Sequence, residues 1–176
     1  MTDLPAQVRF ATRADEADLL KMCHELHEEN GLFDMDEEAV KGTLDHAFDR
    51  KGGLIGVIDG PSGIEASCYL LITSIWYTKE NHLEEMWNFV RPQFRQSNPR
   101  HVDTLLSWAH YCQERMGLPL MIGVLSNHRT EAKVRLYRRR LGMPVGAFFV
   151  IGGKLKHKSI FGNDLFKVHS KKRAAG

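Results

Sequence analysis

The chain has 176 residues, of which 43% are hydrophobic and 26% are charged, and its formal net charge is +2. This length allows one well-buried domain and is too short for two typical ones, and the composition is that of a soluble globular protein. Because there is no run of about 18 apolar residues and no signal-peptide pattern, we expect neither membrane insertion nor secretion, and therefore a cytoplasmic protein. The three cysteines form no CxxC pair, so neither a disulfide framework nor a metal site is expected.

The first half of the chain is expected to contain three strands and two helices. Val8–Thr12 is typical of a short strand. Helical spacing of apolar residues over Asp15–Glu29 predicts a first helix, and a second is expected from about Asp36. The strand-like segments Leu54–Asp59 and Ile64–Thr78 flank a Gly-Pro-Ser-Gly turn, which predicts an antiparallel hairpin.

The second half alternates strands with helices. The pattern predicts a strand at His82–Val90, a helix at Asn98–Met116, a strand at Leu118–Leu125, a helix at about Arg129–Arg140 and a strand at Val145–Ile151. The strand–helix–strand unit implies a parallel pair joined by a right-handed crossover. The whole order predicts an α/β (α+β) fold with a mixed, mainly antiparallel central sheet and helices on both faces.

Charge is distributed unevenly along the chain. Residues 15–49 hold twelve Asp or Glu against two Lys, a balance of −10, whereas residues 127–140 hold six Arg or Lys against one Glu, a balance of +5. From residue 154 onward, seven Lys or Arg stand against one Asp, a balance of +6. Either these surfaces attract ligands of opposite charge, or they are solvated helix faces that pair with each other.

The segment Val90–Leu106 leads from a strand through a cationic loop directly into a helix. Asn98 is a good N-cap and Pro99 suits the first helical position, so the helix is expected to begin near Asn98. The unpaired N–H groups of its first turn favour an anion such as a phosphate. Three side chains of the loop add donors for that anion: Arg95, Arg100 and His101. The alternative is an ordinary capped surface helix with solvated arginines.

Three stretches of the sequence match one known pattern. The first is Val-x-Pro-x-x-Arg, at Val90, Pro92 and Arg95. The second is the paired Leu105 and Leu106 of the following helix, with Ala109 after them. The third is Asn127 followed by Leu136-Tyr137-Arg138-Arg139-Arg140-Leu141-Gly142-Met143. Together with the order of elements, they resemble the GNAT superfamily of acyl-CoA-dependent N-acyltransferases over about residues 7–152. The resemblance implies a GNAT-like acyltransferase domain at 1–153, followed by a basic C-terminal extension at 154–176.

In that family, the end of the fourth strand and the loop after it hold acetyl-CoA, the co-substrate that donates the acetyl group. The resemblance therefore implies that acetyl-CoA is bound by Phe89, Val90, Arg95, Gln96, Ser97, Asn98, Arg100, His101 and Asn127. The loop departs from the family pattern because it contains no glycine, and about three extra residues separate Asn127 from Tyr137. Side-chain contacts from Arg95 and Arg100 are expected to replace the backbone contacts of the missing glycines.

Acyl transfer needs a base for the amine, a polarised carbonyl and an acid for the departing thiolate. The resemblance implies Glu84 or Glu85 as the base and Tyr137 as the acid. Strand alternation places Glu84 on the face of Asn88 and Val90, with Glu85 on the opposite face, and family placement favours Glu84. The alternatives are that both glutamates lie at a solvated strand end and that Tyr137 is an aromatic residue packed on the sheet.

The predicted function is transfer of an acetyl group from acetyl-CoA to a primary amine of a small molecule or peptide. Because the acidic helices form one wall of the acceptor groove in the family, a cationic acceptor such as a polyamine, an aminoglycoside-like amine or a lysine-rich peptide is expected. Trp76, Tyr77 and Trp87 either line this groove or belong to the core. A homodimer is compatible with the sequence, and neither nucleic acid nor a membrane is an expected partner of the enzyme. The alternative function is a catalytically inert GNAT-like binding module whose basic tail contacts nucleic acid or a protein partner.

Overall fold

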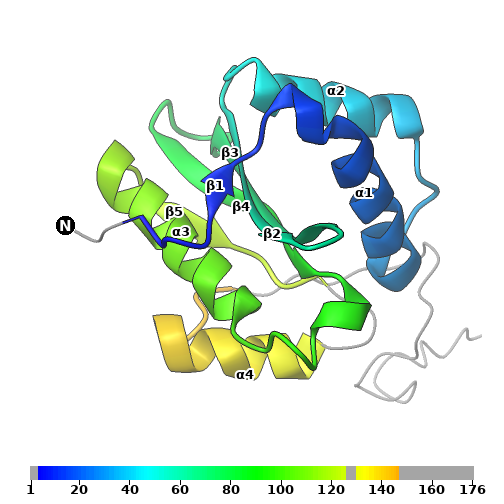
Figure 1. Ribbon diagram of the computed structural model, residues 1–176. Helices are drawn as coiled ribbons and strands as arrows, with labels where there is room; N and C mark the ends of the chain where they lie inside the picture. Colours follow the sequence, from blue (N-terminus) through cyan, green and yellow to red (C-terminus); the bar gives the residue numbers. More distant parts are fainter. Residues whose placement is uncertain (1–3, 126–129, 147–176) are drawn as a thin grey trace, which may run out of the picture.

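The computed structural model describes residues 4–125 and 130–146. Five strands form one sheet in the order β1-β2-β3-β4-β5 (Figure 1). Their bounds are β1 Arg9–Phe10, β2 Gly53–Gly60, β3 Gly63–Ser74, β4 Asn81–Val90 and β5 Leu120–Ile122. The first four strands pair in antiparallel order, and β4 and β5 are parallel. The predicted mixed, mainly antiparallel sheet is confirmed, and so is the parallel pair.

The helices of the described residues cover both faces of this sheet. Their bounds are η1 Arg13–Asp15, α1 Glu16–Asn30, α2 Glu37–Phe48, η2 Pro92–Phe94, α3 His101–Met116 and α4 Thr130–Leu141. Figure 1 shows α1 and α2 on one side of the sheet and α3 and α4 on the other. The helix α2 begins where the sequence predicts it, because the Asp36 carboxylate accepts hydrogen bonds from the amides of Glu38 (3.0 Å) and Ala39 (3.2 Å).

The sheet separates two hydrophobic cores. The core under α1 and α2 consists of Leu19, Met22, Leu44, Ala47, Ile55, Val57, Ile64, Tyr69 and Phe89. The core under α3 consists of Val8, Ile58, Ala66, Cys68, Leu70, Leu83, Leu105, Trp108, Ala109 and Cys112. The strands β2, β3 and β4 contribute side chains to both cores. This fixes their register, since a slip by one residue would exchange the two sets.

Arg91 fastens α1 to the end of β4. Its buried guanidinium contacts Asp18 (Nη2 to Oδ1, 2.8 Å) and Glu25 (Nε to Oε2, 3.3 Å), both on α1. The other carboxylate oxygen of Asp18 accepts a hydrogen bond from the amide of Ile64, at 2.6 Å. One carboxylate thus joins the helix to β3 and, through Arg91, to β4.

The helix α3 begins at His101, so the predicted start near Asn98 is wrong. Arg100 is the residue at the N-cap position, and no side chain caps the helix. The side chain of Asn98 is used elsewhere, because its Nδ2 donates to the Glu65 carboxylate at 2.8 Å. Pro99 consequently lies in the turn before the helix and not at its first position.

Several predicted segments are shorter than expected or lie outside the described residues. The strand β5 covers Leu120–Ile122, although Leu118–Leu125 was expected. In the predicted final strand Val145–Ile151, the first two residues are not in a strand and the other five lie outside the described residues. Asn127 and the extension 154–176 also lie outside them. In the described part of the chain, no helix has both the length and the apolar character needed to cross a membrane.

Candidate active site

The second half of β4 has no neighbouring strand on its β5 side among the described residues. Parallel pairing joins Leu83, Glu84 and Glu85 of β4 to β5, and it ends at Ile122. The strand β4 itself continues to Val90, and among the described residues this part of it pairs with β3 alone. Backbone polar groups on this open edge can therefore hydrogen-bond to an extended ligand lying alongside the strand.

A β-bulge in β4 changes which side chains share a face. Tyr69 of β3 pairs with Trp87 and the next residue of β3 pairs with Glu85, so Met86 has no partner. Because of this extra residue, Glu85 lies on the same face as Asn88 and Val90, and Glu84 lies on the other. The prediction that Glu84 shares the face of Asn88 and Val90 is wrong, because it assumed unbroken alternation.

Glu85 and Tyr137 meet in the space between β4 and α4. The Tyr137 hydroxyl donates to the buried Glu85 carboxylate and lies 3.3 Å from each of its oxygens. Burial raises the pKa of Glu85 to about 7, against the lowering effects of the nearby Lys133 ammonium and the Tyr137 hydroxyl. Burial, followed by the charge of Glu85, raises the pKa of Tyr137. Tyr137 therefore holds its proton at neutral pH, while Glu85 titrates there.

Two further residues of this site were not identified from the sequence. Lys133 lies on α4 one turn before Tyr137 and is partly buried. Burial lowers the pKa of Lys133, whereas the charges of Glu85 and Glu29 act to raise it. Asn88 is buried beside Tyr137, and its Nδ2 lies 3.5 Å from the carbonyl oxygen of Val102 on α3. The four-residue spacing of Lys133 and Tyr137 was a readable signal, since such residues share one helix face.

Arg95 does not extend a free guanidinium into the loop, contrary to the sequence prediction. Its Nε donates to the carbonyl oxygen of Val90 at 2.8 Å, and its Nη2 contacts the Glu29 carboxylate of α1 at 2.6 Å. The guanidinium also lies over the ring of Phe89, 5.2 Å from its centre. Phe89 itself is buried in the core under α1 and α2. Arg95 therefore links the end of β4 to α1, because it contacts both the Val90 carbonyl and the Glu29 carboxylate.

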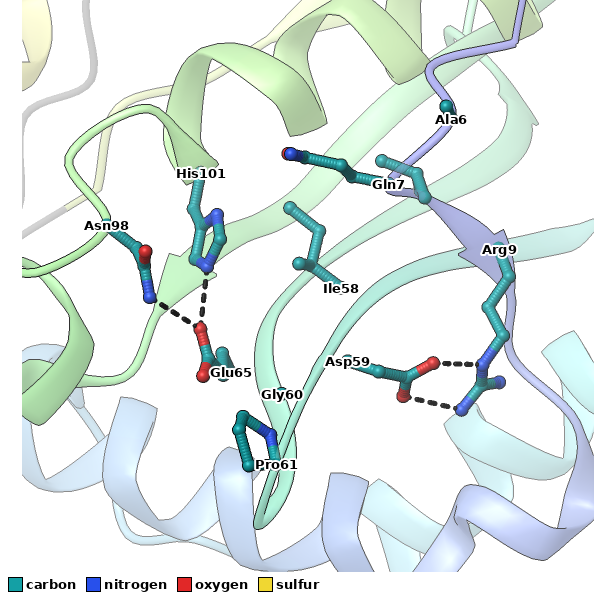
Figure 2. A pocket seen from close by; sticks show the side chains of 11 residues that line it. Ala6, Gln7, Arg9, Ile58, Asp59, Gly60, Pro61, Glu65, Asn98 and His101 are labelled. Atoms are coloured by element: carbon teal, nitrogen blue, oxygen red, sulfur yellow. Dashed lines mark hydrogen bonds and ion pairs between the residues drawn. The ribbon is translucent and has the colours of Figure 1, made fainter.

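Asn98 and His101 also point into the protein. Figure 2 shows both side chains directed at the buried carboxylate of Glu65, whose Oε2 lies 2.8 Å from Asn98 Nδ2 and 2.8 Å from His101 Nε2. This cluster lines a pocket of about 440 Å³ that is bounded on its other sides by β1 and the β2–β3 turn. The prediction that these two side chains donate to a phosphate does not agree with the structure, because both of them already contact the Glu65 carboxylate.

The exposed remainder of the loop still offers donors. Gln96, Ser97 and Arg100 are exposed. Within the described residues, no side chain or backbone carbonyl accepts from the first-turn amides of Val102 and Asp103, because α3 has no side-chain cap. Such amides, at the positive end of a helix dipole, are suited to a phosphate. The contact of these groups with acetyl-CoA stays a prediction, as does that of Asn127.

The acidic segment 15–49 is largely neutralised by cations of the same domain. Arg13 contacts the carboxylates of Asp45 in α2 and of Asp49 just after it, and Lys41 contacts two more in the first turn of that helix. Glu29 is paired with Arg95, and Asp36 caps α2. Much of the charge from which a cationic acceptor was expected is therefore not directed at a ligand.

The three predicted groove aromatics differ in their surroundings. Trp87 is partly buried, packs against Tyr69 with tilted rings whose centres are 4.8 Å apart, and donates to Ser67 Oγ at 2.9 Å. Trp76 and Tyr77 are 93% and 69% exposed in the β3–β4 connection and pack on each other. The core interpretation therefore holds for Trp87 and fails for the other two.

The chain is similar to solved structures of acetyltransferases. No protein-family model matches it, and no curated protein matches it by sequence. An integron cassette protein from a salt-marsh metagenome superposes with a TM-score of 0.64 at 18% identity, covering 87% of this chain and 93% of that one. The apo aminoglycoside 6′-N-acetyltransferase of Acinetobacter haemolyticus gives 0.58 at 14% identity, covering 84% and 97%.

A GNAT family acetyltransferase of Staphylococcus aureus gives a TM-score of 0.53 at 13% identity, covering 84% of this chain and 97% of that one. Because most of each chain is covered in all three comparisons, the fold is that of the GNAT acetyltransferases, and the resemblance read from the sequence is confirmed at the level of the fold. Identities this low establish architecture and leave the reaction to be argued from the site.

Proposed function

We propose that this chain is an N-acetyltransferase that transfers the acetyl group of acetyl-CoA directly to a primary amine. The observation that carries the proposal is the contact of Glu85 with Tyr137, beside the half of β4 that no described strand pairs on its β5 side. An acid–base pair next to an open strand edge provides both the proton transfers and a place for an extended thioester.

Glu85 acts as the general base in this proposal, and Glu84 does not. An attacking amine must lose a proton, and a base is most effective when its pKa lies near the working pH. Glu85 meets this condition, because burial raises its pKa to about 7. Glu84 lies on the opposite face of the strand, away from Tyr137. The bulge therefore supports Glu85 over Glu84 as the base.

Tyr137 acts as the general acid. Its hydroxyl stays protonated, since burial and the charge of Glu85 raise its pKa. When the carbon–sulfur bond breaks, the hydroxyl proton passes to the thiolate, and the proton that Glu85 took from the amine returns to Tyr137 across their 3.3 Å contact. The pair therefore recovers its starting protonation after each turnover.

Acetyl-CoA would lie along the open edge of β4, with its diphosphate at the exposed start of α3. The uncapped amides of Val102 and Asp103 and the side chains of Gln96, Ser97 and Arg100 support this placement. The acceptor class is an amine of a small molecule or peptide. A cationic acceptor draws less support, because most of the carboxylates that would attract it are already paired.

A binding and turnover experiment tests the proposal. Acetyl-CoA is expected to raise the melting temperature by mass action on the folded state, and thiol release is expected with a panel of polyamines, aminoglycosides and lysine peptides. Glu85→Gln should abolish thiol release by removing the base, whereas Glu84→Gln, a matched change one residue away, should retain it. Equal loss in both variants, or a melting temperature unchanged by millimolar acetyl-CoA, contradicts the proposal.

The alternative of an inert binding module depends on residues 154–176, which lie outside the described residues. It stays a prediction, and a salt-sensitive binding of nucleic acid by the full chain that disappears on removing these residues would support it.

A further inference from the structure

An amine of the chain itself lies within the candidate active site. Lys133 precedes Tyr137 by four residues on α4, so the two side chains are neighbours on one helix face. Tyr137 is fixed on that face by its contact with Glu85, and Lys133 interacts electrostatically with Glu85, Glu29 and Arg95. Lys133 therefore lies on the helix face whose Tyr137 contacts Glu85, next to the acid–base pair.

The groups that interact with Lys133 lie at two places along β4. Glu85 is at the point where β4 parts from β5, and the Glu29–Arg95 pair closes the far end of β4, where Arg95 also holds the carbonyl of Val90. Both carboxylates attract the Lys133 ammonium, and the stretch of β4 that no described strand pairs on its β5 side runs between them. This is the stretch of β4 assigned above to the thioester.

We propose that Lys133 is a self-acetylation site, at which the chain transfers an acetyl group from acetyl-CoA to its own Nζ atom. The inference rests on the proposed function, because it uses the same donor and the same acid–base pair. It goes beyond that function in making the chain an acceptor as well as a catalyst.

The transfer balances in atoms and electrons. Lys133 first releases one proton to solvent, and the lone pair of its neutral Nζ then attacks the thioester carbonyl carbon to form a carbon–nitrogen bond. The carbon–sulfur bond breaks, and its electron pair leaves on sulfur. Glu85 takes the second amine proton, Tyr137 protonates the thiolate, and the proton on Glu85 restores Tyr137. The products are Nε-acetyl-lysine and the free thiol of coenzyme A.

The surroundings distinguish Lys133 from other lysines of the described residues. Lys21, Lys51 and Lys79 are exposed, and Lys41 is held by two carboxylates of α2 that raise its pKa. Burial instead lowers the pKa of Lys133, so a larger share of its amine is neutral and nucleophilic at neutral pH. Only Lys133 among these five combines an activated amine with a base and an acid next to it.

Acetylation would also change the catalytic pair. The charge of Lys133 acts to lower the pKa of Glu85, against burial. Converting the ammonium into a neutral amide removes that effect, so the pKa of Glu85 should rise further. The modified chain is therefore expected to need a higher pH to reach half of its maximal turnover rate.

The experiment incubates the full chain with acetyl-CoA and no added amine, and follows acetylation site by site by peptide mass spectrometry. The expected result is one acetyl group per chain at Lys133, formed at a rate independent of protein concentration. Exposed Lys79 reports the background of direct chemical acetylation. Glu85→Gln should slow modification of Lys133 by about 10²-fold or more without changing that of Lys79, and Lys133→Arg should eliminate the fast adduct.

The outcomes separate this inference from the proposed function. If the protein acetylates an added amine while Lys133 reacts no faster than Lys79, the inference is overturned and the enzyme assignment stands. If acetyl-CoA neither raises the melting temperature nor supports transfer to any amine, both are overturned. Tyr137→Phe provides a second variant in case Glu85→Gln fails to fold, and it should slow the modification of Lys133 while leaving Lys79 unaffected.

Discussion

Replacing Glu85 with glutamine is expected to change how the stability of the protein depends on pH. The pKa of this carboxyl group is raised from 4.5 to about 7, because burial penalises its charged form. The folded state therefore binds the proton more tightly than the unfolded state. The stabilisation from that proton is fully present below pH 4.5 and is lost as the pH rises through about 7.

The size of the effect follows from the shift. Each pKa unit corresponds to about 1.4 kcal/mol, so a shift from 4.5 to about 7 corresponds to about 3 kcal/mol in the free energy of unfolding. Glutamine keeps an oxygen that can accept from Tyr137 and cannot ionise. Relative to wild type, Glu85→Gln should gain about 3 kcal/mol between pH 4 and pH 8.

Urea unfolding of both proteins across this pH range measures the difference, in which the titrations of all other groups cancel. Glu84→Gln is the matched control, since it removes a carboxylate from the same strand without touching Tyr137. Parallel stability curves for wild type and Glu85→Gln would refute the reasoning, because they would mean that the Glu85 carboxylate is hydrated in the folded protein.

Three further substitutions test other parts of the structure. Tyr137→Phe should lower kcat by about 10²–10⁴-fold with little change in KM, measured by thiol release, because it removes the proton donor that we propose for the departing thiolate. Arg91→Ala should lower the free energy of unfolding by about 3–5 kcal/mol in urea titration, since it leaves the Asp18 carboxylate without its buried cation. Gly56→Ala should cost about 1–3 kcal/mol in the same assay, because a Cβ there would lie 2.6 Å from the Trp108 ring. A loss below 1 kcal/mol for either of the last two would contradict the packing described.

The elements of the fold could be predicted because each has a local cause in the sequence. Apolar spacing marks α1, and the Asp36 carboxylate marks the start of α2. The start of α3 could not be read in this way. Asn98 has the side chain of a good cap, but Glu65, 33 positions earlier in the sequence, attracts its amide instead. A contact between residues this far apart leaves no local pattern.

The prediction that Arg95 and His101 bind a phosphate failed for the same reason. Arg95 and His101 are cationic or polar residues in a loop, which locally favours exposure and anion binding. Their partners, Glu29 on α1 and Glu65 on β3, come from elements that only the folded sheet brings to the end of β4. Charge within the loop was therefore a poor guide to the direction of its side chains.

The choice of Glu85 as the proposed base depends on Met86, the residue of β4 that has no partner in β3. Strand alternation is a reliable rule until a bulge interrupts it, and the bulge at Met86 arises from pairing with β3, which the sequence of β4 does not encode by itself. Without that residue Glu84 would face Tyr137. With it, Glu85 is buried, at a cost of about 3 kcal/mol at neutral pH that a polar or apolar residue at this position would not incur. A buried carboxylate that lowers stability at the pH where it titrates fits a functional requirement better than a structural one, because costs of this kind are concentrated at sites that perform chemistry.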